Sequence, residues 1–130
     1  MNNYTFAELC LGQKESFSTT ITSEMMDKFL AITGDDNPLH TEAKVVYGML
    51  IASFYSTLVG VYLPGEHCLL RRIKTSFHRP TQIGDKLEIT GEVVELHEST
   101  ATAIVKARIT NGGRLISKAK IEVGLRDGLA

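Results

Sequence analysis

The pattern of apolar positions divides the chain into a helical first half and a strand-rich second half. Four residues in the first half recur at helical spacing and predict one face of a short helix: Met26, Phe29, Leu30 and Thr33. Thr22 is placed to cap the start of this helix, and Gly34 is placed to end it. A longer apolar run, residues 47–61, is hydrophobic on nearly every side, which predicts a long helix that is buried nearly all round.

The second half of the chain alternates between apolar and polar residues and therefore predicts strands. These segments, with a weaker one before the helices, are residues 14–21, 68–78, 87–93, 101–110 and 115–123. Gly91 indicates a bulge or bend, and the Asn-Gly-Gly sequence at 111–113 is typical of a hairpin turn. The tail from residue 124 is expected to be loose. One long helix followed by antiparallel strands predicts a single α+β domain, residues 1–130, with a sheet curved around the helix.

Charge and composition exclude several classes of function. Lysine and arginine number 14 against 15 acidic residues, and because both signs are scattered we expect neither nucleic acid nor a membrane surface as partner. The apolar stretch 45–63 is interrupted by Tyr47 and Ser56, so a helix inside the protein is a better interpretation than a membrane span. The N-terminus shows no signal-peptide pattern, and Cys10 and Cys68 are isolated. These features predict a cytoplasmic protein with two buried free thiols.

The most informative segment is residues 34–40, Gly-Asp-Asp-Asn-Pro-Leu-His. It places the carboxylate of Asp35 and the imidazole of His40 five residues apart on a loop that Pro38 stiffens. A general acid–base pair has to be held close together on a backbone that does not wander, so the two are candidate catalytic residues. Asp35 alone would be read as a turn residue, and Asn37 either stabilises the loop or touches substrate.

Further short motifs follow this segment in order. They are Tyr-Gly-Met-Leu-Ile-Ala-Ser at 47–53, Leu-Pro-Gly at 63–65, Ser-Phe at 76–77, Arg-Pro at 79–80 and Ile-Gly-Asp at 83–85. From about residue 21 to residue 123 the chain resembles the MaoC-like (R)-specific enoyl-CoA hydratases and dehydratases of the hotdog fold. The resemblance implies a homodimer or higher oligomer that acts on acyl thioesters of coenzyme A or acyl carrier protein. The implied reaction is reversible addition of water to a trans-2-enoyl thioester, with neither a metal nor an organic cofactor.

The resemblance also implies roles for individual residues. Asp35 and His40 would share one water, from which one group takes a proton while the other delivers a proton to Cα. The backbone N–H of Gly48, at the start of the long helix, would bind the thioester oxygen as negative charge develops there. Ser56, further along the same helix, would support the site. Tyr47 stands where the family usually has histidine and is a substrate-site candidate, because it can still pack and donate a hydrogen bond.

Two alternative functions and one departure remain open. Residues 41–46 are fewer than is usual in the family, where this segment overhangs the acyl pocket, so the selectivity for chain length is open. A hotdog thioesterase would need an acid on the long helix, and residues 47–63 contain neither Asp nor Glu. A non-catalytic acyl-binding subunit is the second alternative. Four cations are read as solvated strand positions, although coenzyme A phosphates or an acidic carrier face would also suit them: Arg71, Arg72, Lys74 and Arg79.

Overall fold

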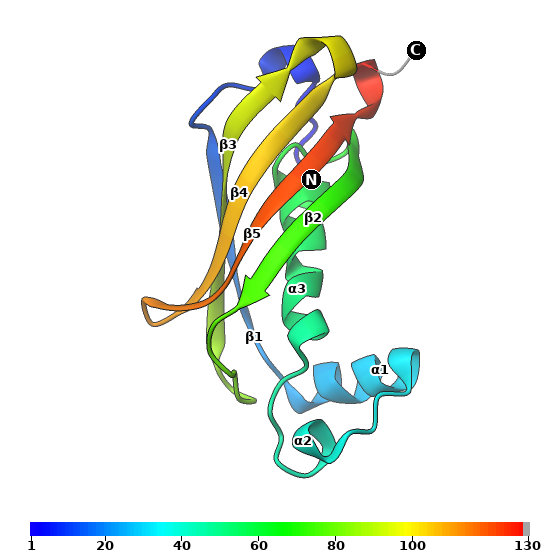
Figure 1. The fold of residues 1–130 in the computed structure, drawn as a ribbon, viewed down its shortest axis with the longest axis vertical. Coiled ribbons are helices and arrows are strands. Elements are labelled where there is room, and N and C mark those ends of the chain that lie inside the picture. The colour runs from blue at the N-terminus through cyan, green and yellow to red at the C-terminus, as the bar shows by residue number, and fades with distance from the viewer. Residues whose placement is uncertain (129–130) are drawn as a thin grey trace.

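A five-stranded antiparallel sheet curves around one helix in the computed structural model, which describes residues 1–128 (Figure 1). The strands, in sheet order, are β1 (Lys14–Thr20), β3 (Lys86–His97), β4 (Thr102–Asn111), β5 (Arg114–Leu125) and β2 (Cys68–Phe77). The helices are α1 (Ser23–Thr33), α2 (Pro38–Thr41) and α3 (Gly48–Thr57), and a π-helical turn at Leu58–Tyr62 continues α3. Short 3-10 turns occupy Phe6–Glu8, Glu98–Thr100 and Arg126–Gly128. The predicted arrangement of a curved sheet around one long helix is confirmed.

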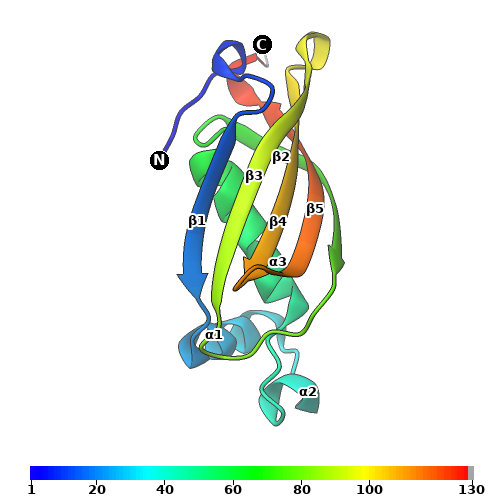
Figure 2. The same cartoon turned by 90° about the vertical axis from the view of Figure 1, so that its left-hand side faces the viewer.

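Helix α3 lies along the inner face of the sheet, while α1 and α2 lie beyond one end of it (Figures 1 and 2). Alternate residues of the central strands face inward and are fully buried, among them Leu87, Ile89, Val105, Ile109 and Ile121. The sequence predicted that this helix is buried nearly all round, and this prediction is wrong. Met49 is 66% exposed, and Ser53 and Ser56, which follow at helical spacing, are exposed as well. One face of α3 is therefore left uncovered by its own chain.

A buried chain of hydroxyl groups fastens the middle of α3 to the sheet. Tyr55 Oη lies 2.8 Å from Ser117 Oγ on β5, which lies 3.1 Å from Thr75 Oγ1 on β2. Burial raises the pKa of Tyr55, although the hydrogen bonds with Ser117 and Thr75 act in the opposite direction. The phenol therefore stays protonated and fixes the helix relative to two strands.

Gly91 serves close packing rather than a bulge. The β3–β4 pairing is regular at Gly91, which lies opposite Ala107, and the register shifts only between Val93 and Glu95. A Cβ atom on Gly91 would lie 2.8 Å from Cδ2 of Leu58, which is closer than real Cβ contacts allow. The predicted bulge at Gly91 is therefore wrong, and its missing side chain makes room for the end of the α3 segment.

The ends of the strands match the sequence at the hairpin and depart from it at the tail. Gly112 and Gly113 both have positive φ, 56° and 83°, as the predicted tight turn requires. The loose tail is wrong for Leu125, which completes β5 and is fully buried; residues 129–130 lie outside the described residues. Cys10 is exposed rather than buried, whereas Cys68 is half-buried and burial raises its pKa to about 11. No helix within residues 1–128 has the length and apolarity of a membrane span.

Candidate active site

The loop after α1 is held by its own side chains. Helix α1 ends at Gly34, whose φ of 71° turns the chain sharply toward Asp35. Asp35 Oδ1 accepts a hydrogen bond from the backbone N–H of Asn37, at 3.2 Å. Asn37 Oδ1 in turn caps α2 by accepting from the N–H of Leu39, at 2.9 Å. Asn37 thus stabilises the loop. It also joins Asp35 to α2, the short helix that carries His40.

His40 is held in one tautomer by a backbone contact. Its Nδ1 lies 2.7 Å from the carbonyl oxygen of Val45. Because a carbonyl only accepts, Nδ1 carries the proton, and Nε2 of the neutral ring is left as the acceptor. No group in the described chain forms a hydrogen bond with Nε2, and no hydrogen bond or ion pair joins the ring to Asp35 within residues 1–128. The imidazole therefore offers a free base to the solvent side of the loop.

Tyr47 contacts both Asp35 and His40, the candidate catalytic residues. Its hydroxyl donates to the carbonyl oxygen of Asp35 at 2.8 Å, and its ring stacks on the His40 ring with 4.1 Å between centroids. Phe29 of α1 packs on it too, with centroids 4.7 Å apart. The residue is 3% exposed, and this burial, with the nearby carboxylates of Asp35 and Asp36, raises the pKa of Tyr47. Tyr47 therefore remains a donor and positions the pair, with its hydroxyl committed to the backbone.

The first turn of α3 opens beside this pair. Gly48 is its first residue, no side chain caps the helix, and the Gly48 N–H meets no acceptor among the described residues. A groove of about 290 Å³ lies here, lined by Val46, Gly48, Ile51 and residues 77–81. Thr81 belongs to this groove, and its Oγ1 is fully buried without a hydrogen-bond partner in the described part of the chain. Free donors thus gather at the positive end of the helix dipole.

The short segment 41–46 folds back on itself instead of covering the groove. Lys44 adopts φ 60°, the Val45 N–H donates to Leu39 O at 3.1 Å, and the Val46 N–H donates to Thr81 O at 2.9 Å. Of the six residues, only Val46 lines the groove. The segment therefore acts as a tight brace between α2 and α3 and leaves the groove open to solvent.

Ser56 is not brought to this groove within the chain. It is exposed and lines a separate cavity of about 400 Å³ with Cys68 and Leu70 of β2. Eight residues of helix separate it from Gly48, a distance of about 12 Å. The structure therefore gathers Asp35, His40, Tyr47 and Gly48 at one place and Ser56 at another. Sequence reasoning missed Thr81 and the Val45 carbonyl, and neither carried a local signal.

Comparison with known proteins gives this geometry a family. The family model described as "Thioesterase superfamily" matches residues 46–118. The (R)-specific enoyl-CoA hydratase of Aeromonas caviae is 34% identical over 116 residues, covering 81% of this chain and 87% of that protein. The 3-hydroxybutyryl-CoA dehydratase of Methylorubrum extorquens is 31% identical over 101 residues, covering 70% of this chain and 64% of that protein. Both names denote hydro-lyases.

The same relationship holds for solved structures. The unliganded R-hydratase PhaJ1 of Pseudomonas aeruginosa superposes with a TM-score of 0.89 at 27% identity, covering 95% of this chain and 86% of that chain. The five-stranded antiparallel sheet around a central helix is thus the hotdog fold that the sequence predicted. The chain belongs to the thioesterase superfamily, in the family that contains the (R)-specific enoyl-CoA hydratases.

Proposed function

We propose that this protein catalyses the reversible hydration of trans-2-enoyl thioesters to (R)-3-hydroxyacyl thioesters, with Asp35 and His40 as its catalytic residues. The observation that carries the proposal is the placement of Tyr47, which binds the Asp35 backbone, stacks on His40 and precedes Gly48. One buried ring thereby orients a carboxylate, an imidazole and an unpaired backbone donor. The names of the relatives support the same reaction.

The substrate is activated through its carbonyl group. The thioester oxygen enters the groove beside Gly48 and accepts the free N–H at the start of α3. Addition of water at C3 moves electrons toward this oxygen, and a helix N-terminus stabilises the negative charge that develops. Gly48 has no side chain, so the carbonyl group can approach the backbone closely.

A single water supplies both the hydroxyl group and the proton that are added. Asp35 accepts a hydrogen bond from the water, while Nε2 of His40 takes a proton from it as the oxygen bonds to C3. The hydrogen bond from Nδ1 to the Val45 carbonyl stabilises the imidazolium that forms. The imidazolium then gives its proton to Cα of the enolate, which restores the neutral ring. Hydroxyl and proton arrive on the same face, so one stereoisomer is formed.

The outer edge of β2 supports a homodimer. Leu70, Ile73 and Phe77 face the inner side of this edge strand and are between 39% and 48% exposed. A row of exposed apolar side chains on an unpaired edge favours pairing with a second copy of the chain. Because Leu70 shares a cavity with Ser56, such a partner would lie beside Ser56 and the uncovered face of α3. Sedimentation that shows only monomer at micromolar concentration would contradict this part of the proposal.

The unpaired thiols Cys10 and Cys68 fit a reducing compartment, and we place the protein in the cytoplasm as a single domain. Expression of a tagged chain followed by fractionation tests this placement. Recovery in the oxidising, secreted fraction would contradict it.

Incubation with crotonyl-CoA tests the reaction directly. Hydration removes the absorbance of the conjugated enoyl thioester and releases no thiol, whereas thioester hydrolysis releases free coenzyme A. The His40→Ala variant serves as the matched control, since its loss of activity ties the signal to the site. Thiol release at the rate of substrate loss would replace the proposal with the thioesterase alternative, and binding without either signal would favour the non-catalytic alternative.

A further inference from the structure

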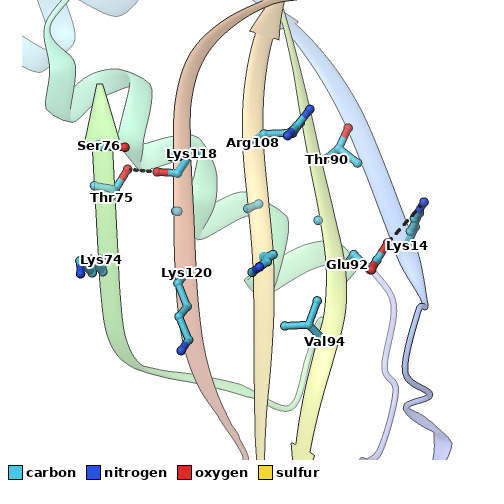
Figure 3. A pocket seen from close by; sticks show the side chains of 14 residues that line it. Lys14, Lys74, Thr75, Ser76, Thr90, Glu92, Val94, Arg108, Lys118 and Lys120 are labelled. Carbon is cyan, nitrogen blue, oxygen red and sulfur yellow. Dashed lines mark hydrogen bonds and ion pairs between the residues drawn. The ribbon is translucent and has the colours of Figure 1, made fainter. Parts of the chain in front are cut away.

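The outer face of the sheet, which is turned away from α3, contains a large charged groove. Its volume is about 730 Å³, and it crosses all five strands (Figure 3). The only acidic residue among those that line it is Glu92 of β3. Six cations line it, from four strands: Lys14, Lys74, Lys106, Arg108, Lys118 and Lys120. The net charge of −1 for the whole chain therefore conceals a basic face.

The cations in this groove face one another across the strands. Lys106 lies opposite Lys120 on one side and Glu92 on the other, Lys120 also lies opposite Lys74, and Arg108 lies opposite Lys118. Like charges in directly opposed positions destabilise a sheet. Lys14 is balanced by Glu92 at 3.3 Å, and Lys120 approaches Glu95 at 4.0 Å. The remaining four cations have no acidic partner within 4.0 Å in residues 1–128. The expectation of scattered charge is therefore wrong for this face.

The side chains indicate a broad partner that binds reversibly. The Lys14 and Lys120 side chains are 66% and 59% exposed, and none of the polar or charged side chains that line the groove is buried. Mobile ammonium groups bind as point charges and do not shape a small-molecule site. A protein surface rich in carboxylates suits them, because such contacts speed encounter and still allow rapid release.

The groove also lies next to the candidate active site along the chain. Ser76 of β2 lines the groove, and the next residue, Phe77, points to the opposite face of the strand and lines the cleft at the start of α3, so the two sites meet across the end of β2. We propose that this basic groove docks the acidic face of an acyl carrier protein that delivers the enoyl thioester. The inference rests on the proposed hydratase function and assigns a protein-bound thioester as its substrate. Transient docking suits a carrier that has to leave after each turnover.

Reversing two groove charges tests the inference. The double variant Arg108→Glu/Lys118→Glu alters one cross-strand pair and touches none of the proposed catalytic residues. With crotonyl-acyl carrier protein at low ionic strength we expect kcat/KM to fall by about 10-fold or more, mainly through KM. With crotonyl-CoA the change in kcat/KM should stay within about twofold. With the carrier substrate, added salt should narrow the difference in kcat/KM between the wild-type protein and the double variant.

The matched control is Lys86→Glu/Arg114→Glu, which makes the same change in net charge at exposed positions outside the groove. Equal losses in the two double variants would reduce the effect to net charge and overturn the inference. The inference would also be overturned if the groove variant kept its kcat/KM for the carrier substrate while it hydrated crotonyl-CoA normally. The proposed function would remain intact in that case. If the wild-type protein hydrates neither substrate, titration with the unloaded carrier protein tests docking separately from catalysis. Salt-sensitive binding that the groove variant loses supports docking, and its absence, or tighter binding of RNA, overturns it.

Discussion

The two ends of the α3 segment differ in how completely their polar groups are paired. At the first turn, the Gly48 N–H, the Thr81 hydroxyl and Nε2 of His40 have no partner among residues 1–128. From the middle of the helix onward, Tyr55 is bonded into the sheet and Leu58 packs against Gly91. Native proteins pair nearly all buried polar groups, so unpaired ones in a groove mark a place for ligand. The first end should govern activity and the second end stability.

The largest effect is expected at the acid–base pair. Asp35→Asn or His40→Ala should lower kcat by roughly 10²–10⁴-fold with crotonyl-CoA, because each removes a proton-transfer or water-orienting group. Both residues are at least partly exposed, so thermal stability should change little. The double variant should be about as slow as the worse single one, because the two act on one water. Near-normal kcat in both single variants would contradict the assignment.

Removing the donor at the start of α3 should come next. Gly48→Pro deletes the N–H. In other enzymes, the loss of one hydrogen-bond donor to a developing oxyanion lowers kcat by about 10²–10³-fold. Proline is tolerated at the first helical position, so the fold should persist. Gly48→Ala keeps the N–H, and its Cβ would meet the Phe77 ring at an ordinary 3.7 Å, so the fold should persist. Because the methyl group crowds the approach of the thioester, this variant should raise KM more than it lowers kcat. A folded proline variant with normal kcat would show that another group holds the oxygen.

Gly91→Ala tests the opposite end. The added methyl group would lie 2.8 Å from Leu58 and 3.1 Å from Val105, so the core has to shift. Such overpacking costs about 1–3 kcal/mol of unfolding free energy. The activity per folded molecule should stay unchanged, because the contact lies far along the helix segment from Gly48. Urea titration and active-site titration together check both statements. A loss of kcat without a loss of stability would contradict the view that this end of the α3 segment governs stability and the first end governs activity.

Tyr47→Phe separates the hydroxyl from the ring. The stacking on His40 survives, but the Asp35 carbonyl loses its 2.8 Å donor. A hydrogen bond of this kind contributes about 1 kcal/mol, so kcat should fall by up to about tenfold. The decrease should appear in kcat rather than in KM if Tyr47 only positions the pair. A rise in KM alone would assign the hydroxyl to substrate binding instead.

The smallest effect is expected at Tyr55. Tyr55→Phe should cost about 1 kcal/mol of unfolding free energy, because Ser117 keeps its bond with Thr75. Burial raises the pKa of Tyr55 in the folded chain. The stability that its neutral form contributes is therefore complete below the unfolded pKa of about 10 and is lost as pH rises through the folded value. Alkaline unfolding curves of the two proteins should converge at high pH, and parallel curves would contradict this account.

The sequence predicted what depends on neighbours along the chain. Thr22 caps α1 through the N–H of Met25, and Gly34 ends it in the left-handed region, because both roles are local. The Asp35–His40 loop was recognisable for the same reason. The bond from Tyr47 to Asp35 joins residues 12 apart, and that from Tyr55 to Ser117 joins residues 62 apart. Such partners are set by tertiary packing, so the positioning role of Tyr47 could not be predicted.

Long-range geometry also explains the errors. Gly91 suggested a bulge because glycine weakens a strand, yet Leu58, which demands the space, lies 33 residues earlier in the chain. The charged groove could not be predicted because all five strands contribute to it, at positions that are far apart in the sequence. A count of charges along the chain cannot reveal that cross-strand register places lysines side by side.

The brace formed by residues 41–46 has a consequence for how the loop after α2 can change in length. The backbone N–H groups of Val45 and Val46 anchor the brace. The Val45 carbonyl oxygen also anchors it, through the contact with the His40 ring. Glu42 and Ala43 are exposed, and their side chains make no hydrogen bond or ion pair within residues 1–128, although both backbone N–H groups donate to Pro38 O. Residues inserted after Ala43 should therefore leave in place the backbone anchors of Val45 and Val46 and the contact between Val45 and His40. The length of this surface loop can then change independently of the geometry of the candidate site.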